Sequence, residues 1–173
     1  MNEPMKTRTS TQKDRRFDRS QALELLSQLP MGELMNLAHL ERMRRFPENT
    51  VTFVVDTNPN YTNVCVTGCV FCAFYRKATD ADAYLLSPED LAGKIEAAAA
   101  KGATTVLLQG GHNPKVGLSE WLAYISAIQA ACPDVHIHPF SPAEIAFMAE
   151  REKCSVGEVL QSLWDAGIRT IPG

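Results

Sequence analysis

The apolar positions of this chain follow two different periods, which predict helices in some stretches and strands in others. In residues 20–29 and 31–46 the apolar side chains recur every three or four positions, as on one face of a helix. Pro30 separates these two stretches. Met31 and Met35 belong to one such stripe, and we expect it to pack as ordinary core. The pattern therefore predicts two short helices at the start of the folded chain.

Further along, runs that are apolar throughout indicate strands covered by helices. These runs occupy residues 51–55, 104–108, 135–140 and 168–171. The last three begin about 31 to 33 residues apart, which is the length of a strand, a helix and two short loops. The spacing predicts parallel strands that alternate with helices. In such folds the chemistry lies at the carboxyl ends of the strands.

Helix-start signals stand between these runs. Ser87-Pro88-Glu89-Asp90 combines a capping serine, a proline at the first helical position and acids in the first turn. Ser141-Pro142-Ala143-Glu144 opens another helix, and Ser155-Val156-Gly157-Glu158 matches a capping box. A further helical run extends from Ser119 to Ala131. The sequence therefore predicts an α/β fold with about four parallel βα units preceded by two short helices.

The domain organisation follows from the same pattern. Residues 1–19 are basic and almost free of apolar side chains, so we expect a disordered tail. We expect a helical segment over residues 20–48 and the βα units over residues 49–173. A closed eight-stranded barrel typically takes ~250 residues. Four units cannot close such a barrel, so we expect either an amino-terminal fragment, truncated at its carboxyl end, or an open sheet.

Composition narrows the function classes. With 173 residues, 45% hydrophobic and 21% charged, the chain fits a single globular domain. A net charge of -3 gives no reason to expect nucleic acid as a partner. No apolar run reaches the roughly 18 residues of a membrane span, and no signal peptide opens the chain. We therefore expect a cytoplasmic protein.

The candidate chemistry lies in two loops that follow the first two strand-like runs. Cys65, Cys69 and Cys72 stand at C-x₃-C-x₂-C spacing, and five cysteines in all favour a metal or redox site over a disulfide framework. Thiolates suit iron-sulfur clusters, zinc or copper(I), and three ligands leave one position open. Closed zinc sites need four ligands, and no second ligand pair follows downstream. The turn over residues 109–112, Gln-Gly-Gly-His, permits close backbone approach.

With Phe71 just before the last cysteine, the loop resembles the signature of the radical S-adenosylmethionine (SAM) superfamily. The resemblance implies a TIM-type (β/α) barrel, of which this chain would be the first half. It implies that the three cysteines hold a 4Fe-4S cluster whose open iron chelates SAM, which is cleaved to a 5′-deoxyadenosyl radical. It also implies a set of residues that contact the cofactor: Phe71, Gln109, Gly110 and Gly111. His112 departs from the acidic residue that often ends the family's glycine turn.

The segments on either side of the three cysteines resemble a smaller group within this superfamily. Residues 60–64 and 73–76 look like the menaquinone and deazaflavin branch of the superfamily. The closest likeness is to the cyclic dehypoxanthinyl futalosine synthase (dehypoxanthine futalosine cyclase) family, through residues 51–56, 74–76, 108–112, 136–138 and 141–145. This implies a radical cyclisation of dehypoxanthine futalosine in the futalosine pathway of menaquinone biosynthesis. It also implies a reductase, flavodoxin or ferredoxin as electron donor.

That reaction needs a base, and we consider three candidates near strand ends: Tyr75, His112 and His138. His136 and His138 share one face of a strand, so a His-x-His metal site is an alternative for this pair. For the whole chain we also consider an aminofutalosine synthase or a deazaflavin-forming enzyme. From a different class, we consider a non-catalytic iron-sulfur or zinc-binding module, or an inactive fragment.

Overall fold

The computed structural model describes residues 16–173, and the chain divides into two compact units after Thr52. The predicted tail over residues 1–19 lies mostly outside the described residues. Where the structure begins, Asp18 caps the first helix through a capping box with Gln21, so Arg19 is already helical. No helix within the described residues is long and apolar enough to cross a membrane.

The first unit contains the two predicted helices, α1 (Arg19–Gln28) and α2 (Met31–Arg45). Glu41 binds two arginines one turn further on, at 2.7 and 2.8 Å. The expectation that the methionine stripe is core is wrong, because no residue of either helix is buried and Met31 is 71% exposed. Two helices of 10 and 15 residues present too little apolar surface to enclose a core between them.

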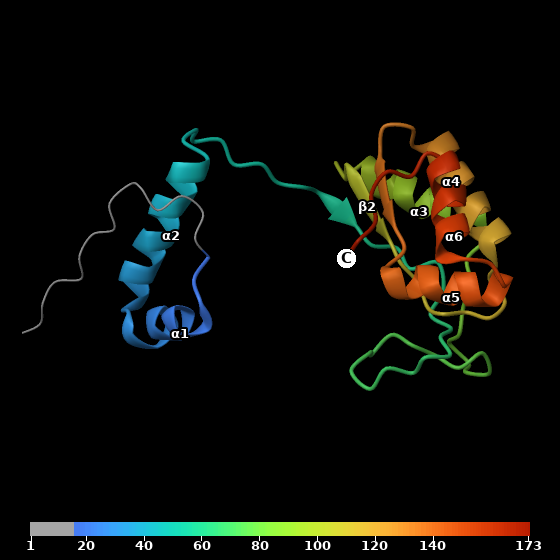
Figure 1. The fold of residues 1–173 in the computed structure, drawn as a ribbon. Helices are drawn as coiled ribbons and strands as arrows, with labels where there is room; N and C mark the ends of the chain where they lie inside the picture. Colours follow the sequence, from blue (N-terminus) through green and yellow to red (C-terminus); the bar gives the residue numbers. More distant parts are fainter. Residues whose placement is uncertain (1–15) are drawn as a thin grey trace, which may run out of the picture. The chain divides into compact units, whose positions relative to one another are not determined.

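The second unit is an α/β structure with a parallel sheet, which confirms the predicted fold class. Within the described residues the sheet has the order β1-β2-β3 and consists of β1 (Asp56–Thr57), β2 (Thr105–Leu108) and β3 (His136–Pro139). Helices follow each strand in turn, and Figure 1 shows them gathered beside the sheet. They are α3 (Pro88–Ala99), α4 (Leu118–Ala131), α5 (Pro142–Glu152) and α6 (Val156–Asp165).

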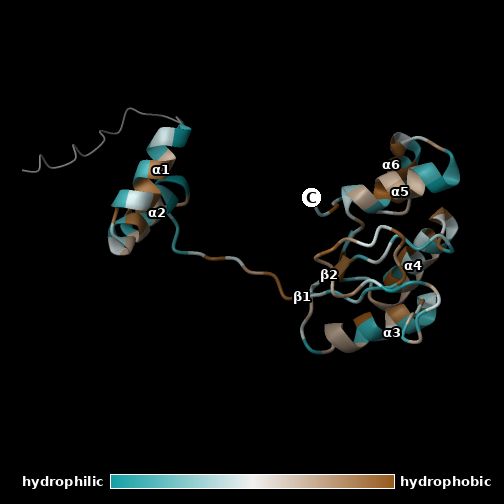
Figure 2. Cartoon of the chain, turned by 90° about the horizontal axis from the view of Figure 1, so that it is seen from below, coloured by the Kyte–Doolittle hydropathy of each residue, from teal (hydrophilic) through white to brown (hydrophobic). Residues whose placement is uncertain are grey.

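Two of the four predicted strands are wrong in detail. Residues 51–55 are exposed, and only Asp56 and Thr57 pair with β2. The reason is that the neighbouring strand, β2, does not extend further back. The Val55 carbonyl accepts the N–H groups of Thr104 and Thr105, and β2 begins at this point. Earlier residues pair with no strand of the described sheet. Figure 2 shows the largely brown, apolar segment that leads into β1.

Residues 168–171 are also not a strand, so the described chain has three strands rather than four. The Ile168 N–H bonds back to the Leu163 carbonyl of α6 instead of to β3. The segment still lies beside β3, because both His136 and His138 bond to the Thr170 hydroxyl. It therefore extends along the sheet through side chains alone.

The core lies between the sheet and the helices. Val106, Leu108 and Ile137 alternate inward along β2 and β3, as the parallel register requires. Trp121 of α4 stacks on Phe140 just after β3, with ring centroids 3.6 Å apart. Capping serines begin α3, α5 and α6 as the sequence predicts. This packing holds the carboxyl ends of the strands, where the candidate loops begin.

Candidate functional site

The cysteine loop follows β1 and is fixed at its base. Figure 1 shows it in green, extending beyond the helices. The Cys65 N–H bonds to the Arg76 carbonyl at 3.1 Å, and the Arg76 N–H bonds to the Asn63 carbonyl at 2.7 Å. The Arg76 guanidinium also binds Asp82 at 2.7 Å. At the tip Phe71 is 89% exposed. The loop therefore has a rigid base and a solvated tip.

The base of this loop docks on the glycine turn that follows β2. The Val66 N–H bonds to the His112 carbonyl at 3.1 Å, and the Gly111 N–H bonds to the Thr62 carbonyl at 3.2 Å. In addition, the Thr67 hydroxyl contacts His112 Nδ1 at 2.7 Å. The structure thus brings together the two motif segments that the sequence placed at one edge of the sheet.

Both glycines of the turn are required by this docking. A Cβ on Gly111 would overlap the Val64 carbonyl, which belongs to the cysteine loop. A Cβ on Gly110 would lie 2.5 Å from the Tyr61 ring. The close approach that glycine permits is therefore made to the protein's own backbone and to a core tyrosine. A contact of these glycines with SAM stays a prediction, as it does for Gln109 and Phe71.

The thiols fit a soft metal or cluster through their chemistry. Burial raises the pKa of Cys65, but N–H groups of Thr67 and His112 directed at its sulfur outweigh this and lower it below its usual value. Cys69 and Cys72 lie on the loop tip, half-buried. Across residues 16–173, no three His, Cys, Asp or Glu side chains are placed to hold a metal ion.

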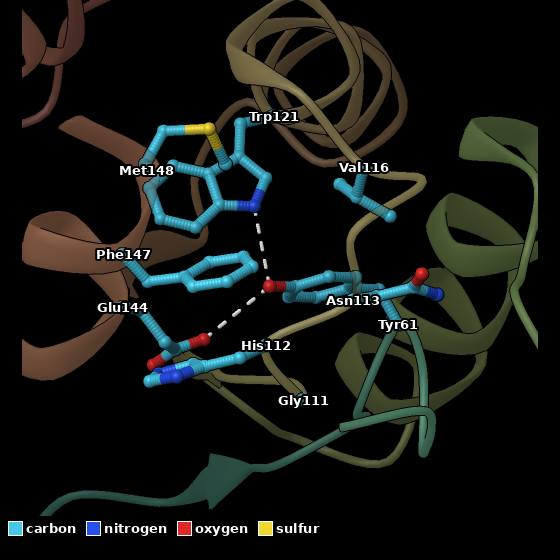
Figure 3. Close-up of a pocket in the computed structure, with 9 residues that line it drawn as sticks. All are labelled: Tyr61, Gly111, His112, Asn113, Val116, Trp121, Glu144, Phe147 and Met148. Atoms are coloured by element: carbon cyan, nitrogen blue, oxygen red, sulfur yellow. Dashed lines mark hydrogen bonds between the residues drawn. The ribbon is translucent and has the colours of Figure 1, made fainter. Parts of the chain in front are cut away.

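A small pocket lies beside the turn, lined by residues of four segments (Figure 3). The lining residues are Tyr61, Gly111, His112, Asn113, Val116, Trp121, Glu144, Phe147 and Met148. At its centre, the Tyr61 hydroxyl accepts the Trp121 Nε1–H at 3.2 Å and donates to Glu144 Oε1 at 3.3 Å. Glu144 is only 4% exposed, and burial raises its pKa. Sequence reasoning did not identify Tyr61, Trp121 or Glu144 as site residues.

The three predicted base candidates lie in different places. His112 lines the pocket and stacks on Phe147, with ring centroids 4.7 Å apart. Tyr75 is half-buried near the base of the cysteine loop. His138 lies on the sheet, where its Nδ1 contacts the Thr170 hydroxyl at 2.7 Å. Of the three, only His112 joins both the loop and the pocket.

The histidine pair of β3 does not form a metal site with a third ligand in the part of the chain that is described. His136 Nε2 and His138 Nδ1 instead contact the same Thr170 hydroxyl, at 2.8 and 2.7 Å. A hydroxyl can donate one hydrogen bond and accept others, so it satisfies both rings. The two histidines therefore serve to hold the segment after α6 against the sheet.

Comparison with known proteins adds to this geometry. Residues 59–172 match the model of the radical SAM superfamily. The chain is 43% identical over 130 residues to a 5-amino-6-(D-ribitylamino)uracil–L-tyrosine 4-hydroxyphenyl transferase of Thermosynechococcus vestitus, covering 72% of this chain and 33% of that protein. A transferase of the same name from Methanopyrus kandleri is 38% identical over 158 residues, covering 91% and 42%.

FO synthase of Mycobacterium tuberculosis is 45% identical over 123 residues, covering 71% of this chain and 14% of that protein. The chain thus spans less than half the length of each of these relatives. The family match covers both the cysteine loop and the glycine turn, and such enzymes use a 4Fe-4S cluster and SAM. The chain belongs to the radical SAM superfamily.

Proposed function

We propose that this chain is part of a deazaflavin-forming radical SAM enzyme, which transfers the 4-hydroxyphenyl group of L-tyrosine to 5-amino-6-(D-ribitylamino)uracil. The observation that carries the proposal is the likeness to transferases of that name, 38% identical over 91% of this chain. FO synthases, at 45% identity, support the same branch. The deazaflavin-forming enzyme, a second choice from the sequence alone, thus has more support than the futalosine cyclase.

The cysteine loop would hold the cofactors of this reaction. Cys65, Cys69 and Cys72 would ligate the cluster, and the two glycines would place the turn beside it. When bound, the cluster and SAM supply a radical that removes a hydrogen atom from the substrate. The lowered pKa of Cys65 favours the thiolate, which is the form of cysteine that ligates metals.

The chain's own side chains would order the space around this chemistry. Trp121 and Met148 are buried and form part of the pocket lining. His112 is placed to hold a proton, because Thr67 engages its Nδ1 and leaves Nε2 for another partner. We therefore propose His112, rather than Tyr75 or His138, as the proton-handling residue.

The cluster is tested first. The chain is reconstituted anaerobically with iron and sulfide, and electron paramagnetic resonance is recorded with and without SAM. We expect a four-iron signal that changes when SAM is added. Cys69→Ser serves as the control, since it removes one ligand and should abolish the signal. A chain that binds only zinc, or whose signal ignores SAM, would show a non-catalytic module.

The substrate is tested next by product analysis. The reduced chain is incubated with SAM, L-tyrosine and 5-amino-6-(D-ribitylamino)uracil, and in parallel with dehypoxanthine futalosine. We expect 5′-deoxyadenosine to form only in the first mixture, together with a product carrying the 4-hydroxyphenyl group. A cyclised product in the second mixture would instead support the futalosine cyclase and overturn our proposal.

A further inference from the structure

Glu144 at the start of α5 is the buried carboxylate of the described residues, and it faces the glycine turn. Its two oxygens have different surroundings. Oε2 accepts the N–H and the hydroxyl of Ser141, both at 2.8 Å. Oε1 accepts the Gly110 N–H at 2.9 Å and the Tyr61 hydroxyl at 3.3 Å. All four of its partners donate.

The capping box explains only Oε2. Ser155 and Glu158 form the same box at the start of α6, where Glu158 Oε2 also accepts the N–H and hydroxyl of the serine at 2.8 Å. Glu158 is exposed, however, and its box begins a helix as well as that of Glu144 does. Capping a helix therefore requires neither the burial of Glu144 nor its contact with Gly110.

The Oε1 contacts join three segments at the edge of the sheet. Gly110 belongs to the turn after β2, Glu144 to the helix after β3, and Tyr61 to the segment that leads into the cysteine loop. Tyr61 is 1% exposed and is held by the Trp121 indole, so the carboxylate rests on a fixed partner. Gly111 in turn binds the backbone of the cysteine loop. Glu144 is therefore connected to the cysteine loop through the single peptide unit that joins Gly110 and Gly111.

We propose that Glu144 is a positioning residue for the Gly110–Gly111 turn, and through that turn for the binding of SAM beside the cysteine loop. The inference rests on the proposed function in so far as the turn binds SAM. The carboxylate fixes the direction of the Gly110 peptide, which sets where the cysteine loop docks. An amide at this position would place an NH₂ group against donors on one side or the other, so glutamine cannot replace it.

Glu144→Gln and Glu158→Gln form a matched pair for the test, because both alter one capping box and only the first touches the turn. In the cluster-free chain, we measure hydrogen exchange of the Gly110, Gly111 and Val66 amides. We expect faster exchange in Glu144→Gln, by about tenfold or more, and wild-type exchange in Glu158→Gln. Equal exchange in the two variants would overturn the proposal.

SAM affinity is then measured on the reconstituted proteins at equal cluster content. We expect the Kd to rise about tenfold in Glu144→Gln and to stay unchanged in Glu158→Gln, which a purely structural cap would not produce. An unchanged Kd in both variants would refute the link to SAM. A wild-type protein that binds no SAM would refute the proposed function, while the exchange result would still decide the role of Glu144 in the turn.

If Glu144→Gln does not fold, Ser141→Ala keeps the inference testable. This variant removes the hydroxyl partner of Oε2 and leaves the contacts of Oε1 in place. We expect α5 to be less stable and the Gly110 amide to stay protected. Loss of Gly110 protection in this variant would show that the cap, and not the Oε1 contact, holds the turn.

Discussion

Replacing Gly111 by alanine should detach the cysteine loop from the sheet. The new Cβ would overlap the Val64 carbonyl and lie 2.9 Å from the Cys65 Cβ. Neither neighbour is the end of a flexible side chain, so the strain cannot be relieved by a rotamer change. The backbone of the loop must move instead.

The magnitude follows from the contacts that this movement breaks. They are the hydrogen bond from Val66 to His112 at 3.1 Å, that from Gly111 to Thr62 at 3.2 Å, and the Thr67–His112 contact at 2.7 Å. Each contributes about 1 kcal/mol net, and overpacking itself costs about 1–3 kcal/mol. We expect the free energy of unfolding to fall by about 2–3 kcal/mol, since the loop can retain part of its contacts.

Gly93→Ala is the matched control. Gly93 lies inside α3 with open space around it, so alanine should stabilise by about 0.5–1 kcal/mol through helix propensity. Urea unfolding followed by tryptophan fluorescence suits both variants, because Trp121 and Trp164 both lie in the second unit. If the free energy of unfolding of Gly111→Ala lies within about 0.5 kcal/mol of the wild-type value, the cysteine loop does not dock on the turn as described.

Three further outcomes test other parts of the structure. Burial raises the pKa of the Glu144 carboxyl above 4.5. The stability that this group contributes is therefore present below pH 4.5 and is lost as pH rises through its folded-state pKa. Hydrogen bonds from Ser155 lower the pKa of Glu158, so the stability that Glu158 contributes is lost as pH falls below 4.5. The difference in free energy of unfolding between the wild type and each glutamine variant, measured against pH, should show these opposite trends. Differences that run in parallel for the two variants would contradict them. In the cluster-free chain at neutral pH, iodoacetamide should label Cys65 before Cys132, because the pKa of Cys65 is lowered and burial raises that of Cys132. Labelling is followed by mass spectrometry, and in urea the two cysteines should react at similar rates. Lys153 is the residue that caps the end of α5, and its φ is 56°. Lys153→Gly should therefore stabilise the protein by about 0.5–1 kcal/mol in thermal unfolding. A loss of stability would show that contacts of the lysine side chain outweigh the backbone strain.

The helices of the second unit could be predicted because their signals are local. A serine followed three residues later by an acid satisfies N–H groups of the same helix, whatever surrounds it. Strand boundaries carry no such local signal. Residues 51–54 have β-branched and aromatic side chains, yet they pair with no strand of the described sheet, because β2 begins only at Thr105. A strand depends on its neighbour, and the neighbour's length is set far away in the chain.

The same distinction separates the parts of the site that could be predicted from those that could not. The cysteine spacing is local, and it identifies the loop without knowledge of the fold. Glu144 is 34 residues from Gly110, and its Ser-x-x-Glu box has the same form in the sequence as that of Glu158. Both glutamates are followed by a buried aliphatic residue, so apolar patterning does not tell them apart.

What distinguishes the two glutamates is which strand precedes the helix. Helix α5 begins directly after β3, which pairs with β2 in parallel, so its first turn lies beside the turn that ends β2. Helix α6 follows another helix, so no strand of the described sheet directly precedes its first turn. In a parallel sheet, a capping glutamate that directly follows a strand can reach the neighbouring strand's loop. The order of the elements, combined with the capping box, is thus the sequence signal that would have identified Glu144.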